Sequence, residues 1–215
     1  GRGAAKSRQL VRQAARRNPG AVVIVAGCYP QTAAEEVLAI PGVSIALGTQ
    51  DRGRVVELVE EAIASRSIAG ESEARPAISA VGDIRRAREF EETPIEEFAG
   101  RTRAAVKIQE GCNQYCTYCI IPYARGPVRS RLPESIRLEV ERLAAAGFKE
   151  VVLTGIHLGS YGLDLAVDGA YQPDQSGGQP AGQSDGQSAA QPVSLAGIVR
   201  MIHAIDGIER IRLSS

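Results

Sequence analysis

The sequence predicts an α/β protein in which parallel strands alternate with helices. Short apolar runs rich in β-branched residues, such as residues 21–26, recur between segments whose apolar residues have helical spacing. In the second half of the chain, the order strand, helix, strand, helix, strand implies parallel pairing through helical crossovers. The 215 residues, 44% of them hydrophobic, suffice for one or two domains with a core.

Residues 1–66 are predicted to be a portion of an α/β domain that the chain enters partway. Its expected elements, in order, are a basic helix at 4–17, a buried strand at 21–26, a helix at 32–39 capped by Thr32, a strand at 43–47, and a helix capped by Asp51 whose apolar face holds Val55, Val59, Ala62 and Ile63. Cys28 falls in a loop directly after the first strand. Loops at the carboxyl ends of strands hold the ligands of open α/β sheets.

Residues 67–101 are predicted to be a linker between two domains, with some strand or short helix. The stretch Gly70-Glu71-Ser72-Glu73 and the acidic cluster after it favour solvent over a core. Residues 102–215 are predicted to be the first portion of a second α/β domain. Its expected elements are a strand at 103–109, a helix at 133–146 that Pro133 begins and Gly147 ends, a strand at 150–156, a helix at 194–205 and a strand at 208–214.

A low-complexity insertion interrupts this second domain at residues 168–192. Gly-Gln pairs recur there every four residues, at Gly178, Gly182 and Gly186, among Ser, Ala, Pro and Asp. Tyr171 is its single large apolar side chain, so ordering the segment would bury too little apolar surface to offset the chain entropy. We therefore expect a disordered insertion in a strand-to-helix loop.

The formal net charge of zero conceals separate basic and acidic blocks. Residues 1–34 carry six basic side chains and no acid, residues 101–131 are mainly basic, and residues 89–97 are mainly acidic. Such blocks are typical of solvated helix faces and equally of a phosphate-binding surface. No apolar run approaches the roughly 20 residues that cross a bilayer, and no signal peptide is visible, so we expect a cytoplasmic protein with no membrane partner.

Three of the four cysteines, Cys112, Cys116 and Cys119, lie within eight residues in a C-x-x-x-C-x-x-C pattern. Thiolates are strong soft metal ligands, and three closely spaced sulfurs suit three corners of a cubane iron–sulfur cluster whose fourth iron stays open. A zinc site completed by a distant fourth ligand and three buried thiols are the alternatives. Cysteines clustered as ligands, not spread as pairs, also indicate a reducing, cytoplasmic interior.

The cysteine spacing, with Tyr118 before the third cysteine, resembles the signature of radical S-adenosylmethionine (SAM) enzymes. Longer runs narrow the resemblance to the methylthiotransferase branch, and within it to the enzymes that act on threonylcarbamoyladenosine beside the tRNA anticodon. These runs are VKIQEGC at 106–112, IPYARGPVRSR at 121–131, VLTGIHLGSYG at 152–162 and AGCYPQ at 26–31. The resemblance implies a partial Rossmann-like N-terminal domain followed by the first part of a radical-SAM (β/α) partial TIM barrel.

The resemblance also implies the cofactors. Cys112, Cys116 and Cys119 would hold a 4Fe–4S cluster whose open iron binds the amino and carboxylate groups of SAM. One electron would cleave SAM to methionine and a 5′-deoxyadenosyl radical, which would abstract hydrogen from carbon 2 of the modified adenine. No side chain is assigned to the chemical step itself.

Several side chains are candidates for cofactor contact. Tyr118 is expected near the adenine of SAM, with packing beside the cluster as the alternative. Gly155 permits close backbone approach to a cofactor, and His157 is expected to touch cofactor or substrate, or else to bond a loop carbonyl. Candidates for cofactor or RNA phosphates, or else solvated surface arginines, are Arg125, Arg129 and Arg131.

Cys28 resembles the last of three cysteines that bind an auxiliary 4Fe–4S cluster in methylthiotransferases. The other two ligands would lie before Gly1, so we expect this chain by itself to hold about one cluster. In the family, the auxiliary cluster takes part in supplying sulfur, and the methyl group comes from another SAM.

The resemblance therefore predicts a tRNA methylthiotransferase that makes 2-methylthio-threonylcarbamoyladenosine. Its partners would be the tRNA anticodon loop and an electron donor such as a flavodoxin or ferredoxin. Siblings that modify isopentenyladenosine in tRNA, or a ribosomal protein, share the framework and are alternatives. An alternative of another class is a noncatalytic metal-binding RNA module, which a colourless zinc protein that leaves SAM intact would support.

Overall fold

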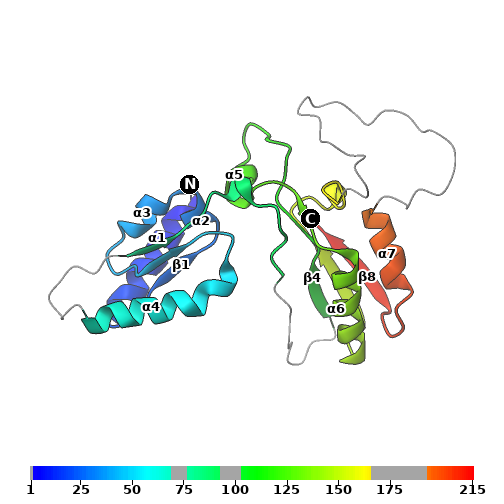
Figure 1. The fold of residues 1–215 in the computed structure, drawn as a ribbon, viewed down its shortest axis with the longest axis horizontal. Coiled ribbons are helices and arrows are strands. Elements are labelled where there is room, and N and C mark those ends of the chain that lie inside the picture. The colour runs from blue at the N-terminus through cyan, green and yellow to red at the C-terminus, as the bar shows by residue number, and fades with distance from the viewer. Residues whose placement is uncertain (1, 69–76, 93–102, 166–192) are drawn as a thin grey trace. The chain divides into compact units, whose positions relative to one another are not determined.

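The computed structural model describes residues 2–68, 77–92, 103–165 and 193–215 (Figure 1). The chain forms two compact units. Unit 1 consists of Gly1–Thr93 and Asn113–Pro127, and unit 2 consists of Pro94–Cys112 and Val128–Ser215. The cysteine pattern therefore begins in unit 2, with Cys112, and continues in unit 1, with Cys116 and Cys119.

Unit 1 is built on a parallel sheet of three short strands in the order β1-β2-β3 (Figure 1). Its strands are β1 (Ile24–Ala26), β2 (Ile45–Leu47) and β3 (Ile78–Ala80). Its α-helices are α1 (Arg2–Arg17), α2 (Cys28–Thr32), α3 (Ala34–Leu38), α4 (Val55–Ile68) and α5 (Ile121–Arg125). Short 3-10 turns lie at η1 (Arg52–Arg54) and η2 (Ile84–Arg86). Ala46 packs into one apolar cluster, while Ile45 and Leu47 pack into another with Leu58 of α4. A parallel strand covered on both faces is expected to be apolar throughout, as β2 is.

The predicted start of the helix at 32–39 was wrong. A first short helix, α2, begins at Cys28, and Thr32 ends it by donating its hydroxyl to the Cys28 carbonyl at 2.9 Å. Ala33, with φ −151° and ψ 54°, breaks the chain before α3. Pro30 is tolerated because it lies in the first turn of α2, where no intrahelical N–H is needed.

The predicted cap at Asp51 was also wrong. Asp51 adopts a left-handed conformation, with φ 57°, and its side chain caps nothing. Glu91 instead accepts the backbone N–H of Arg52 at 2.5 Å and that of Gly53 at 3.3 Å. A carboxylate at this position satisfies orphan donors and favours the helix dipole. Ile63, expected on the apolar face of α4, is 51% exposed, and Leu58 lies in the core in its place.

Residues 77–92, within the expected linker, contribute the third strand of the unit 1 sheet. Ile78, Ser79 and Ala80 pair in parallel with Ile45, Ala46 and Leu47. Some strand was expected in this segment, but as part of a linker and not as a member of the unit 1 sheet. The remainder of the expected linker, residues 69–76 and 93–102, lies outside the described residues.

Unit 2 confirms the parallel pairing predicted for the second half of the chain. Its elements are β4 (Arg103–Lys107), β5 (Gln109–Glu110), β6 (Arg129–Ser130), α6 (Pro133–Ala145), β7 (Glu150–Thr154), the 3-10 turn η3 (Leu158–Ser160), α7 (Leu195–His203) and β8 (Arg210–Ser214). The parallel sheet has the order β4-β7-β8, and β5 and β6 form a separate antiparallel pair. Figure 1 shows α6 and α7 lying along this sheet. The α/β class is thereby confirmed.

A buried ion pair lies beneath α6 in the core of unit 2. Arg131, expected as a phosphate ligand or a surface arginine, is 4% exposed and pairs with Glu139, which is 2% exposed. The Arg131 guanidinium also donates to Ser135 at 3.0 Å, and the Tyr161 hydroxyl donates to the Arg131 carbonyl at 2.7 Å. Arg131 is therefore turned into unit 2 and is engaged structurally.

The predicted insertion at 168–192 lies outside the described residues, but the chain on either side of it meets within unit 2. A Cβ on Gly162 would lie 2.0 Å from the Val193 carbonyl oxygen, so only glycine fits there. Leu165 and Val193 pack on the same core. In the described part of the chain, no helix has the length and apolar character that a membrane span requires.

Candidate cluster and cofactor site

The strand ends of unit 2 place Cys112 and the loop that holds Gly155 and His157 at the same edge of the sheet. β4 and β7 are parallel neighbours, so Lys107 and Thr154 pair at their carboxyl ends. From that edge the chain runs through β5 to Gly111, whose φ of 76° favours glycine, and then to Cys112, which is half-buried. Two of the predicted site segments therefore lie close together in unit 2.

Gln109 joins these two segments through its side chain. Its amide nitrogen donates to the carbonyls of Glu110, at 2.9 Å, and of Gly111, at 2.7 Å. Its amide oxygen accepts the backbone N–H of His157 at 2.8 Å. The side chain is fully buried.

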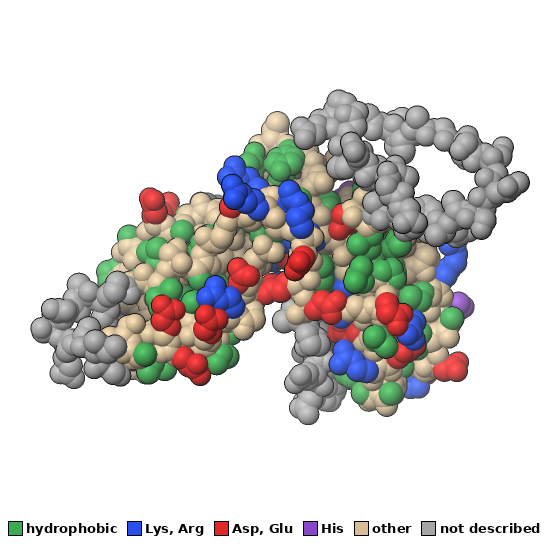
Figure 2. Space-filling view, viewed as in Figure 1, with side chains coloured by type: hydrophobic (Ala, Val, Ile, Leu, Met, Phe, Trp, Pro, Cys, Tyr) green, Lys and Arg blue, Asp and Glu red, His purple; other side chains and the backbone are tan. Residues whose placement is uncertain are grey.

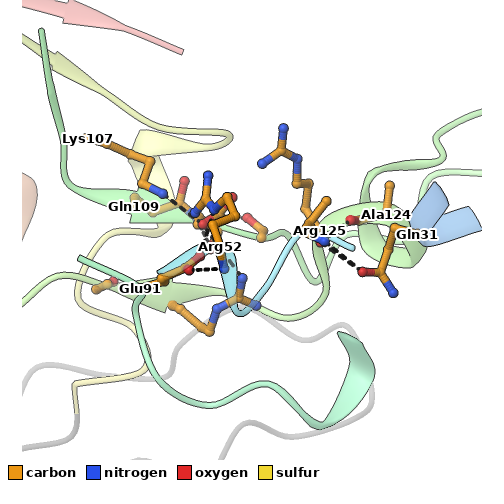
Figure 3. Close-up of polar contacts among 12 residues, drawn as sticks. Gln31, Arg52, Glu91, Lys107, Gln109, Ala124 and Arg125 are labelled. Atoms are coloured by element: carbon orange, nitrogen blue, oxygen red, sulfur yellow. Dashed lines mark hydrogen bonds and ion pairs between the residues drawn. The ribbon is translucent and has the colours of Figure 1, made fainter. Parts of the chain in front are cut away.

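A buried carboxylate lies next to Gln109. Glu110 is 2% exposed and accepts from the Lys107 ammonium at 3.0 Å, and the Arg129 guanidinium lies 3.9 Å from the same oxygen. Figure 3 shows Lys107 extending toward this contact. Arg129 is 2% exposed, so it is engaged inside unit 2 and differs from a solvated surface arginine. Charges removed from water need such partners.

Gly155 and His157 occupy the loop after β7. A Cβ on Gly155 would lie 2.9 Å from the Gln109 amide oxygen and 2.7 Å from Leu158 Cδ2, so the glycine allows Gln109 to approach. The His157 imidazole is exposed, and its Nδ1 lies 2.5 Å from the Ser160 hydroxyl. His157 therefore bonds within its own loop, but to a side-chain hydroxyl and not to the loop carbonyl that was expected as its alternative partner.

The rest of the cysteine loop belongs to unit 1. The Cys119 N–H donates to the Cys116 carbonyl at 2.9 Å, which closes a turn between the two cysteines. Cys116 is exposed and Cys119 half-buried. Tyr118 is 91% exposed, and Tyr115, with φ 45°, packs edge-on against Tyr123 at a centroid separation of 5.9 Å.

Helix α5, directly after the cysteine loop, lies against the segment that carries Cys28. The Arg125 Nε donates to the Cys28 sulfur at 3.1 Å, and the buried Thr49 hydroxyl donates to the Ala124 carbonyl at 2.8 Å. Gln31 accepts the Thr49 N–H at 2.9 Å and donates to the Gly82 carbonyl at 2.8 Å. Figure 3 shows Gln31, Ala124 and Arg125 gathered at this contact. Cys28 therefore lies beside residues close in sequence to the three clustered cysteines.

The four cysteines fit iron–sulfur ligation by their chemistry. All four are free thiols, and none is fully buried. Among the described residues, no three His, Cys, Asp or Glu side chains are gathered in a geometry that would hold a metal ion. Three thiols on a loop without helix or strand between Gly111 and Ile120 match the donor set and the short spacing of an open cluster.

Several charged side chains outside the site form ion pairs. Figure 2 shows acidic and basic side chains interspersed on the face in view. Pairs include Arg54 with Glu57, Arg85 with Asp83, and Arg212 with Glu150. Asp83 has its pKa lowered by the hydrogen bond from Arg85. Surface pairs of this kind add little stability.

Sequence reasoning missed Gln109, Glu91 and the partner of Cys28. Gln109 and Glu91 are polar residues that contact segments distant in the sequence, so neither periodicity nor spacing points to them. A signal for Gln109 existed in its position between a strand and the cysteine loop. Arg125 was singled out, although for phosphate and not for sulfur.

Residues 106–171 match the model of the Radical SAM superfamily, a stretch that begins in β4 and contains the three clustered cysteines and the loop after β7. We therefore place this region of the chain in the radical SAM superfamily, and the recognition made from the cysteine spacing is confirmed. Membership implies SAM and a 4Fe–4S cluster as cofactors.

Similarity to named proteins extends over most of the chain. The threonylcarbamoyladenosine tRNA methylthiotransferase MtaB of Bacillus subtilis (strain 168) is 49% identical over 160 residues, covering 74% of this chain and 34% of that protein. The MtaB protein of Aquifex aeolicus (strain VF5) is 40% identical over 209 residues, covering 97% and 42%. The tRNA-2-methylthio-N(6)-dimethylallyladenosine synthase of Pelotomaculum thermopropionicum is 36% identical over 207 residues, covering 95% and 38%.

The predicted resemblance to methylthiotransferases is thus confirmed as a sequence relationship. The chain spans between 34% and 42% of the length of these relatives.

Proposed function

We propose that the protein is a tRNA methylthiotransferase that converts threonylcarbamoyladenosine next to the anticodon into its 2-methylthio derivative. The observation that carries the proposal is a C-x-x-x-C-x-x-C loop that follows β4 of the parallel sheet through the short strand β5, in a chain 49% identical over 160 residues to an enzyme named for this reaction. The relative named for dimethylallyladenosine is 36% identical, which favours an isopentenyladenosine substrate less.

The three clustered cysteines would hold the 4Fe–4S cluster. When bound, the cluster and SAM supply one-electron chemistry that side chains do not provide. The chain's own contribution would be to hold the sulfurs and to orient SAM. Gly155 would admit SAM against the backbone, the exposed Tyr118 ring would lie against its adenine, and His157 would contact cofactor or substrate.

Cys28 would be one ligand of an auxiliary 4Fe–4S cluster. Its contact with Arg125 supports this role, because hydrogen bonds to ligating sulfurs tune iron–sulfur clusters. The parallel sheets support a Rossmann-like first domain and a portion of a radical-SAM partial barrel as the second. A flavodoxin or ferredoxin would deliver the electron, and the tRNA anticodon loop would be the substrate.

Nucleoside mass spectrometry of tRNA from cells that lack the full-length gene tests the proposal. We expect loss of 2-methylthio-threonylcarbamoyladenosine and accumulation of the unmodified precursor. The wild-type gene should restore the product, while a gene carrying Cys112→Ala should not. Loss of 2-methylthio-isopentenyladenosine instead would identify the sibling activity. An unchanged nucleoside profile would contradict methylthiotransfer to tRNA.

A further inference from the structure

Gln109 is a fully buried carboxamide and the first residue of β5, the short strand that leads to the cysteine loop. Both hydrogens of its NH₂ group are used, one on the Glu110 carbonyl and one on the Gly111 carbonyl, and its oxygen accepts the His157 N–H. A flipped amide would direct an oxygen at two carbonyls, so one orientation fits. Every polar atom of the side chain is satisfied by backbone.

The groups that Gln109 binds belong to two separate segments of the expected site. The Gly111 carbonyl immediately precedes Cys112, and the His157 amide lies 48 residues after Gln109 in the sequence. Gly155 leaves the space that the carboxamide needs, since a Cβ there would lie 3.0 Å from Gln109 Cβ and nearer to its oxygen. The loop is also fixed from β8, because Gly155 donates its N–H to the Ser214 carbonyl at 3.2 Å.

We propose that Gln109 is a positioning residue that holds the start of the cysteine loop at a fixed distance from the loop that receives SAM. This inference rests on the proposed function, since it assigns Cys112 to the cluster and the loop from Gly155 to His157 to SAM. SAM must bind the open iron and the protein at once, so a fixed separation of the two segments favours its binding. Gln109 itself contacts neither ligand, and it acts through the backbone at Gly111 and His157.

The first test needs no cofactor. In the ¹⁵N-labelled chain, we expect the His157 amide to exchange with solvent roughly 2- to 10-fold faster in Gln109→Ala than in the wild type, as loss of one hydrogen bond allows. Gln109→Glu preserves the size of the side chain but loses both donors toward the carbonyls, so it distinguishes the effect of the lost hydrogen bonds from that of lost packing. Equal exchange rates in wild type and Gln109→Ala would contradict the bond.

The second test uses the anaerobically reconstituted full chain and SAM itself. The perturbation of the reduced-cluster EPR spectrum by SAM reports its affinity, and iron and sulfide analysis reports cluster content. In Gln109→Glu and in Gly155→Ala, we expect cluster content near that of the wild type and SAM affinity reduced about tenfold, as expected for a substitution next to a metal ligand. Gly159→Ala is the matched control, because its Cβ would meet only His157 atoms at 3.7 Å or more.

A double-mutant cycle makes the coupling specific. Gln109→Ala removes the amide oxygen that Gly155→Ala would crowd, so the two effects on SAM affinity should sum to more than the effect of the double variant. A wild-type chain that takes up no cluster would overturn the proposed function. The positioning role alone would be overturned if the wild-type chain binds cluster and SAM, and Gln109→Glu and Gly155→Ala bind SAM as tightly as the wild type does.

Discussion

The Arg125 Nε donates a hydrogen bond to the Cys28 sulfur across 97 residues of sequence, at 3.1 Å. Both residues lie in unit 1, where α5 carries Arg125 and α2 begins with Cys28. The side chain singled out for phosphate thus meets the side chain singled out as a cluster ligand. This contact ties the segment after the clustered cysteines to the segment of the predicted auxiliary site.

A double-mutant cycle should detect the contact in the cofactor-free chain. We expect Arg125→Leu and Cys28→Ala to show a coupling free energy of about 0.5–1.5 kcal/mol in urea unfolding, the usual net value of a hydrogen bond. Arg125→Leu with Thr117→Ala is the control pair, because the exposed Thr117 takes no part in this bond. Additive effects of Arg125→Leu and Cys28→Ala would show that the bond contributes nothing.

The cluster ligands give a second prediction. Anaerobic reconstitution of the chain should yield a brown protein that reductively cleaves SAM, and Cys112→Ala, Cys116→Ala or Cys119→Ala should abolish the cleavage, because two thiolates do not preserve the cluster geometry. Formation of 5′-deoxyadenosine measures it. Thr117→Ala, in the same loop but without a ligand atom lost, should retain cleavage. A triple alanine variant that still makes 5′-deoxyadenosine would disprove the assignment.

Removing the low-complexity segment should change stability little. Gly162 and Val193 are already in contact, so deletion of residues 168–192 leaves ends that a short loop can join. Loop entropy changes by only about 0.6 kcal/mol for each doubling of length. Thermal melts of the two proteins should therefore agree within about 4–8 °C, the shift that roughly 1 kcal/mol produces in a small domain. Gly162→Ala is the contrasting variant and should melt much lower, since its Cβ meets a carbonyl oxygen. A large drop on deletion would mean that the segment packs on the domain.

From the burial of Tyr161 we predict that the stability of the folded state declines at alkaline pH. Burial, and then the nearby Asp164 carboxylate, raise the pKa of Tyr161 well above its ordinary value of 10.0. The folded state therefore holds the phenolic proton longer than the unfolded state. Its contribution is fully present below pH 10 and is lost as the pH rises above that value toward the raised pKa.

Urea unfolding at pH 8, 9.5 and 10.5 measures this effect. Tyr161→Phe should lower the free energy of unfolding at pH 8 by about 1–3 kcal/mol, because the buried Arg131 carbonyl loses its donor. It should also make the decline above pH 10 shallower. Tyr118→Phe is the control, since Tyr118 is 91% exposed. Parallel curves for wild type and Tyr161→Phe would contradict the role of the buried phenol.

Local patterns in the sequence determined the class of fold and predicted a cluster-binding role for the cysteine loop. The helix at α1 and the helix that Pro133 begins follow from apolar spacing and from proline's fixed φ, which act within a few residues. The parallel order of β4, β7 and β8 follows from helices between strands. The spacing of the three clustered cysteines is a property of the covalent chain, so it can be recognised without the tertiary structure.

The tertiary structure decided which polar groups meet. Glu91, not Asp51, satisfies the N–H groups before α4, Arg131 is turned inward to Glu139, and Gln109 joins the starts of two loops. Each of these contacts joins residues that are more than one helical turn apart in the sequence. A buried polar atom pairs with whichever partner the packing brings within about 3 Å. Because such partners are selected by burial and not by local propensity, the sequence predicted the candidate ligands, and the tertiary structure decided which residues hold their loops in place.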